Sequence, residues 1–87
     1  MKLINLINPS ANLAELAQLC AADDLLLLRQ DAVYLACQPN LAFPVPILAL
    51  LSDVTWRQLR IPAHIRAISD AEWVKLSAQA EQNLLWS

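Results

Sequence analysis

Apolar residues along this chain gather in four short runs, and turn or capping residues separate the runs. A bounded run of this length is typical of a strand that is buried on both faces. The predicted strands are Leu3–Ile7, Leu25–Leu28, Ile47–Leu51 and a weaker one at His64–Ile68. The unbroken leucines of the second run predict a strand at the centre of the sheet.

The interval after the first run has helical spacing. Leu13, Leu16 and Cys20 recur every three or four residues, which predicts an amphipathic helix over residues 12–22. Asn12 precedes the apolar stripe and is the expected N-cap.

Three further helices are predicted from capping residues. They are a short helix from Asp31 to about Cys37, one over 54–59 behind Ser52-Asp53, and one over 71–83 behind the capping box Ser69-Asp70-Ala71-Glu72. Pro39-Asn40 should end the first of these, and the proline-rich segment Phe43–Pro46 should form a loop or an edge. Trp73, Leu76 and Ala80 should line the inner face of the last helix.

Strands that alternate with helices through short connections indicate a parallel sheet with helices on both faces. We therefore expect an α/β fold, namely a small three-layer α/β/α domain with a mainly parallel sheet of four to five strands. The length of 87 residues fits one domain over 1–87.

Composition narrows the function classes. Hydrophobic residues make up 57% of the chain and charged residues 16%, which excludes disorder. Glycine is absent, so the phosphate-binding loop, the dinucleotide fingerprint, the EF-hand loop and the nucleophile elbow are excluded. No spacing of metal ligands occurs, and we expect neither a metal nor a cofactor.

Charge and hydropathy bear on the partners. The formal net charge is −2 and the four arginines are scattered, so direct binding of nucleic acid is not expected. The longest uncharged stretch, 32–52, contains three prolines and is not a membrane span. The start of the chain lacks the apolar core of a signal peptide, and we expect a cytoplasmic protein with free thiols.

The high fraction of hydrophobic residues in so short a chain indicates that part of its apolar surface is buried against other subunits. A small domain has a marginal core of its own, and oligomerisation is the expected supplement. The candidate interface residues are Trp56, Leu85 and Trp86. The two tryptophans are chosen because aromatic side chains are enriched in interface cores. For Trp86 two placements remain open, namely an interface and packing on its own domain.

Few residues are candidates for chemistry. Cys20 is a weak catalytic candidate, because it lies on the apolar stripe at a helix C-terminus, where the helix dipole raises a thiol pKa. Cys37 is expected at a helix end, and His64, the only histidine, has Asp70 or Glu81 as a conceivable partner. The aspartates that follow helices or strands are expected to serve as caps and solvated turns, and they are Asp23, Asp24, Asp31 and Asp53.

Several segments, in order, resemble the TusB/DsrH family. The resemblance covers nearly the whole chain: the block Asp24–Tyr34 with its Gln30-Asp31 turn, Ile47–Leu50 followed by Asp53, Ile65–Asp70 followed by Trp73–Leu76, and the terminal Leu85-Trp86. The family commonly has a glycine after Gln-Asp, where this chain has Ala32, and the glycine after the third helix is missing too. Local turns should therefore differ, since alanine resists positive φ.

The resemblance implies a role. The DsrH branch has a cysteine in its first helix, which falls near Leu16 rather than at Cys20, so the chain looks like the TusB branch. That branch supplies a non-catalytic subunit of a cytoplasmic sulfur-relay complex with TusC-like and TusD-like partners. The expected complex is a heterohexamer that supports 2-thiouridine formation at the tRNA wobble position, and the chain alone is not expected to be an enzyme. The alternatives are a sulfur carrier of DsrH type that uses Cys20, and a homo-oligomeric binding module of the same fold.

Overall fold

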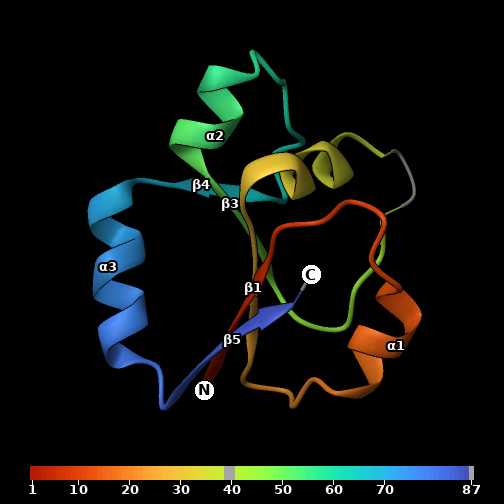
Figure 1. The fold of residues 1–87 in the computed structure, drawn as a ribbon, viewed down its shortest axis with the longest axis vertical. Helices are drawn as coiled ribbons and strands as arrows, with labels where there is room; N and C mark the ends of the chain where they lie inside the picture. The colour runs from red at the N-terminus through yellow and green to blue at the C-terminus, as the bar shows by residue number, and fades with distance from the viewer. Residues whose placement is uncertain (39–40, 87) are drawn as a thin grey trace.

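The structure is a computed structural model that describes residues 1–38 and 41–86. Its five strands form one parallel sheet in the order β4-β3-β2-β1-β5 (Figure 1). The elements are β1 (Lys2–Leu6), α1 (Leu13–Gln18), β2 (Leu25–Leu28), η1 (Gln30–Cys37), β3 (Ile47–Leu50), α2 (Leu51–Trp56), β4 (Arg66–Ile68), α3 (Asp70–Gln79) and β5 (Gln82–Trp86). The predicted α/β class is confirmed, and the leucine run of β2 lies at the centre of the sheet, as predicted.

The sheet separates two apolar clusters. Successive side chains of a strand point to opposite faces, so Ile4 of β1 lies in one cluster and Leu3 in the other. The first cluster includes side chains from α1, η1 and α2, among them Leu16, Val33 and Val54. Among the described helices, only α3 packs on the second cluster, and it lies apart from the other helical segments in Figure 1. The predicted inner face of α3, with Trp73, Leu76 and Ala80, is confirmed.

α1 is shorter than the predicted span of 12–22. Its N-cap is confirmed, because the Asn12 side chain accepts a hydrogen bond from the Glu15 N–H at 3.1 Å. The helix ends early, since the Leu19 N–H bonds to the Leu16 carbonyl at 3.0 Å, a tighter connection than the α-helical one.

The predicted caps of the next two helices are wrong. η1 is a 3₁₀ helix whose N-cap is Arg29, with Asp31 inside its first turn. β3 passes directly into α2, whose N-cap is Leu50, so Ser52 and Asp53 lie within the helix rather than before it. The carboxylates of Asp31 and Asp53 bind Arg57 instead.

The capping box of α3 is confirmed. The Ser69 hydroxyl accepts the Glu72 N–H at 3.1 Å, and the Glu72 carboxylate accepts the Ser69 N–H at 3.3 Å. The helix ends before the predicted 83, because the backbone becomes extended at Ala80 and residues 82–86 pair with β1. The pattern of apolar residues predicts no strand over these residues.

The remaining connections agree with the prediction where the structure describes them. Phe43–Pro46 is a loop that buries Val45 against the sheet. The predicted helix stop at Pro39-Asn40 lies outside the described residues. Within 1–38 and 41–86, no helix is long and apolar enough to cross a membrane.

Candidate functional site

The turn after β2 carries the Gln30-Asp31 pair. Gln30 has a positive φ of 50°, and its N–H donates to the Asp53 carboxylate at 2.9 Å. Arg57 joins Asp31 at 3.0 Å and Asp53 at 3.3 Å, and the bond to Asp31 raises the pKa of the Arg57 guanidinium. The motif residues therefore hold η1 and α2 together across the carboxyl ends of β2 and β3.

The missing glycines change two turns in different ways. Ala32 is fully buried inside η1, and the left-handed residue is Gln30, two positions earlier. After α2, Gln58 has a φ of 53° in the region that favours glycine. Among the described residues, these two glutamines alone have a positive φ.

Cys20 lies at the end of α1 and is half-buried. Its thiol donates to the Leu16 carbonyl at 3.5 Å, one helical turn back. Burial and the charge of Asp24 raise the pKa of this thiol, against the opposing effect of Lys2. These features keep the thiol protonated, which disfavours nucleophilic attack.

The other two candidates for chemistry, Cys37 and His64, have no contact with each other or with Cys20 among the hydrogen bonds and ion pairs of the described residues. Cys37 is exposed at the end of η1, and its sulfur lies 3.7 Å from the Arg60 carbonyl. His64 is exposed in the loop before β4. Its two conceivable partners are engaged elsewhere: Asp70 accepts a hydrogen bond from Ser52 at 2.9 Å, and Glu81 pairs with the amino group of Met1 at 3.4 Å.

Asp24 differs from the solvated turn that the sequence predicted, because it is buried. Its carboxylate accepts the N–H of Lys2 at 2.9 Å and that of Ala21 at 2.8 Å, and it pairs with the Lys2 ammonium at 3.1 Å. Burial alone would raise the pKa of Asp24, but these three groups lower it to about 2. The residue is a structural anchor that joins the start of β1 to the loop before β2.

The three predicted interface residues have different surroundings. The Trp56 side chain is 82% exposed and the Leu85 side chain 66%, whereas Trp86 packs in part against the first apolar cluster. A hollow of about 610 Å³ opens beside Trp56, lined also by Leu51, Ser52, Thr55, Ser69, Asp70 and Ala71. Leu51 is 44% exposed, so the hollow and Trp56 together form an apolar patch between α2 and the start of α3.

Sequence reasoning missed a polar pair on the face of the sheet that α3 covers. Asn5 of β1 is only 7% exposed, and Arg29 follows β2 on the same face. The buried Asn5 Oδ1 and the buried Arg29 Nε each have no hydrogen-bond partner within the described part of the chain. The only signal in the sequence is an asparagine inside an apolar strand.

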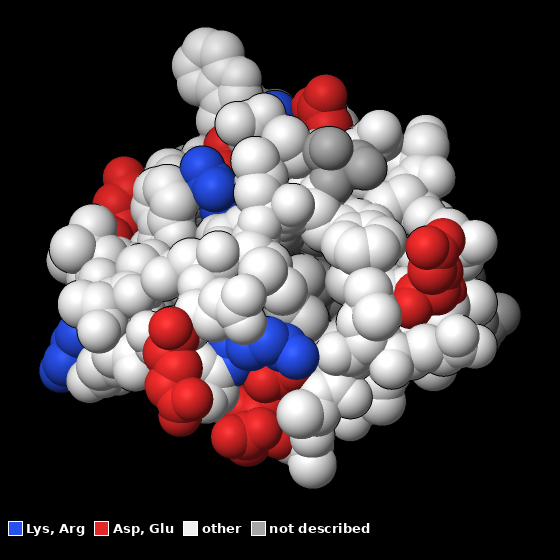
Figure 2. All heavy atoms as spheres, turned by 60° about the horizontal axis from the view of Figure 1, so that its bottom comes forward, with Lys and Arg blue, Asp and Glu red and all other residues white. Residues whose placement is uncertain are grey.

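Charge is sparse on the surface. In the view of Figure 2 the acidic and basic side chains stand singly or in small groups between wide areas of other residues. No basic patch appears on this face.

Comparison with known proteins gives the family. A search of the curated proteins found no match. The model of the family described as DsrH like protein matches residues 8–83, which include every element from α1 to α3 and the start of β5. The parallel sheet with its flanking helices is consistent with that family, which implies a protein related to sulfur relay. The chain belongs to the DsrH-like family.

Proposed function

We propose that this chain is a non-catalytic subunit of a cytoplasmic sulfur-relay complex of TusB type. With TusC-like and TusD-like partners it would support 2-thiouridine formation at the tRNA wobble position, in a heterohexamer. Family membership supports a sulfur-relay role, and the resemblance to the TusB branch motivates the finer assignment.

The apolar patch at Trp56 is the observation that carries the subunit role. A tryptophan that is 82% exposed beside a half-exposed leucine is costly to leave in water, and such patches mark protein interfaces. The half-buried thiol of Cys20, with its raised pKa, supports a role without catalysis.

Co-expression with TusC-like and TusD-like proteins tests the proposal. The wild-type chain is expected to elute with both as one complex in size-exclusion chromatography. Trp56→Gln should release this chain from the complex. Val74→Gln, at a side chain that is 66% exposed on α3, is the matched control and should leave the complex intact. A monomer that ignores both partners would sink the proposal.

The exposed thiol of Cys37 favours one alternative, a sulfur carrier. Incubation of the complex with a persulfide donor, followed by mass spectrometry, separates the two functions. The subunit role predicts no gain in mass on this chain, while a carrier gains the mass of one sulfur atom. The same measurement on the variants Cys37→Ser and Cys20→Ser then identifies the thiol that carries the added sulfur atom.

A further inference from the structure

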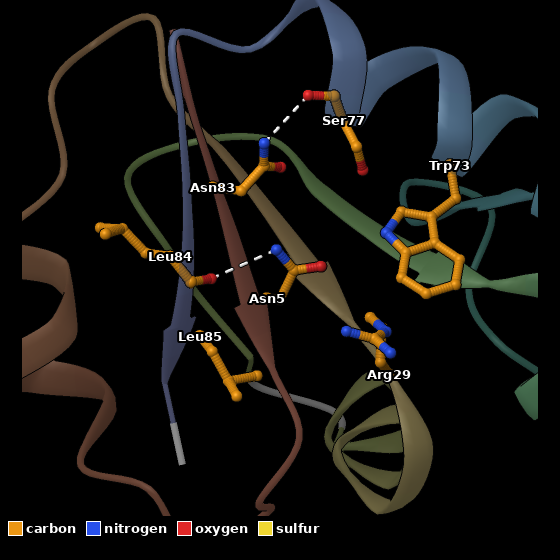
Figure 3. Close-up of a pocket in the computed structure, with 7 residues that line it drawn as sticks. All are labelled: Asn5, Arg29, Trp73, Ser77, Asn83, Leu84 and Leu85. Carbon is orange, nitrogen blue, oxygen red and sulfur yellow. Dashed lines mark hydrogen bonds between the residues drawn. The ribbon is translucent and has the colours of Figure 1, made fainter.

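A hollow of about 250 Å³ lies on the face of the sheet that α3 covers only in part (Figure 3). α3 packs over the second apolar cluster, which includes Leu3 of β1 together with residues of β2, β3 and β4, and the hollow lies beside α3 over β1 and β5. The hollow is lined by Asn5, Arg29, Trp73, Ser77, Asn83, Leu84 and Leu85. It brings together residues from β1, β5, α3 and the end of β2.

Asn5 presents a fixed hydrogen-bond acceptor to this hollow. Its Nδ2 donates to the Leu84 carbonyl at 3.2 Å and to the Leu3 carbonyl at 3.4 Å, which sets the orientation of the amide. Oδ1 then points away from β5 toward the hollow, as Figure 3 shows, and it has no hydrogen-bond partner among residues 1–38 and 41–86. A buried carbonyl oxygen without a donor costs free energy, so a ligand that supplies an N–H is favoured.

Arg29 presents a cation and a second unpartnered group. Its guanidinium lies 4.1 Å from the centre of the Trp73 ring, which holds the side chain over the hollow. Nε is buried without an acceptor, and no carboxylate of residues 1–38 and 41–86 forms a salt bridge with Arg29. A guanidinium in this state favours a carboxylate, which accepts two of its hydrogen bonds.

The two groups and the apolar walls define the ligand. It must carry a carboxylate for Arg29, an N–H for Asn5 Oδ1, and an apolar group for the surfaces of Trp73 and Leu85. The last residue of a polypeptide has all three, because its carboxylate, its amide N–H and its side chain share one Cα. We propose that this hollow binds the C-terminal residue of a partner polypeptide, an apolar one. The proposal goes beyond the proposed function and does not depend on which proteins form the complex.

Binding of N-acetyl-L-leucine, a model of an apolar chain end, tests the site on the full chain alone. In ¹H–¹⁵N spectra it should give saturable shifts of the Trp73 indole N–H and the Asn5 side-chain amide. N-acetyl-L-leucinamide lacks the carboxylate and 4-methylpentanoate lacks the N–H, so each should bind at least about tenfold more weakly. Free L-leucine carries an ammonium instead of the amide. If it binds more tightly than the acetylated compound, the hollow is a site for free amino acids and the proposal is wrong.

Arg29→Met removes the charge and keeps an apolar stem over Trp73, so affinity should fall at least about tenfold. Arg60→Met removes the same charge from an exposed arginine and should not change the affinity. If Arg29→Met does not fold, Asn5→Ser, which shortens the acceptor, replaces it with the same expected loss. The proposal is wrong if N-acetyl-L-leucine, N-acetyl-L-leucinamide and 4-methylpentanoate bind with equal affinity. It is also wrong if Arg29→Met or its replacement Asn5→Ser binds as tightly as the wild type, or if the spectral shifts lie outside the hollow.

Discussion

At the scale of single residues, Gln58 holds a conformation that suits glycine. α2 ends in a Schellman motif, in which the Leu59 N–H bonds to the Val54 carbonyl at 3.1 Å and the Gln58 N–H to the Thr55 carbonyl at 3.0 Å. The motif requires a residue with a left-handed backbone conformation after the C-cap. A residue that carries a Cβ is strained in this conformation, whereas glycine is not.

We predict that Gln58→Gly raises the free energy of unfolding by about 0.5 to 1 kcal/mol, because the strain disappears while the motif stays. Urea denaturation measures the change. Gln38→Gly is the matched control, since Gln38 also follows a helix but has a φ of −74°. That variant should lose stability, and a loss in both variants would show that Gln58 is not strained.

The two thiols should differ in reactivity. Cys37 is exposed, whereas Cys20 is half-buried and its pKa is raised by burial and by Asp24. Limited alkylation with iodoacetamide at neutral pH, followed by mass spectrometry, is therefore expected to label Cys37 first. Cys20 should react at a comparable rate only after unfolding, and faster labelling of Cys20 in the native chain would contradict the structure.

At the scale of elements, α3 is the only described helix that packs on the second apolar cluster, so the stability of this face of the sheet depends on it. None of its side chains is fully buried, so the capping box at Ser69 is an important part of its stability. We predict that Ser69→Ala lowers the free energy of unfolding by about 1 kcal/mol. Thermal unfolding followed by circular dichroism measures the loss.

Ser77→Ala is the control for this cap. Ser77 lies inside α3, and its contact with Asn83 uses the backbone carbonyl, which the substitution leaves in place. Alanine has the higher helix propensity, so the stability should stay the same or rise by about 0.5 kcal/mol. Equal losses at the two serines would mean that the cap contributes nothing specific.

The elements also show what the sequence could predict. β2 and the capping box of α3 are encoded locally, by four consecutive leucines and by Ser69 with Glu72, and both are as predicted. β5 has no such signal, because its polar first residues and the exposed Leu85 do not form an apolar run. Its conformation depends on hydrogen bonds to β1, which lies far away in the sequence.

At the scale of the whole molecule, stability should depend on acid through Asp24. Its pKa in the folded chain is about 2, below the ordinary value of 3.8, so the folded state binds this proton less readily than the unfolded state. The stabilisation, about 2 kcal/mol, is therefore present above pH 4 and lost as the pH falls from about 4 to 2.

Asp24→Asn should lower the free energy of unfolding by about 2 kcal/mol at pH 7, and the difference from the wild type should shrink toward pH 2. Asp23→Asn is the control, because the side chain of Asp23 is 74% exposed and its ion pair with the amino group of Met1 is accessible to water. Urea titrations across this pH range measure both. A difference that stays constant with pH would exclude the carboxylate as its cause.

The candidate sites belong to this scale too, which is why only part of them can be predicted from the sequence. The sequence predicts Trp56 and Leu85 as interface residues, and the structure leaves both exposed. Asn5 lies in β1 and Arg29 directly follows β2, so the two meet only when the sheet has formed and no spacing in the sequence links them.

The pairing of β5 with β1 has a consequence for folding kinetics. Asn5 and Leu84, which contact each other across this pair, are 79 residues apart in the sequence. Closing so long a loop is entropically costly, and non-local pairings form slowly. A chain in which β5 has not yet paired presents the free backbone groups on one side of β1 to other strands, and such an edge favours aggregation. Expression of this protein should therefore respond more to chaperone supply than its small size suggests.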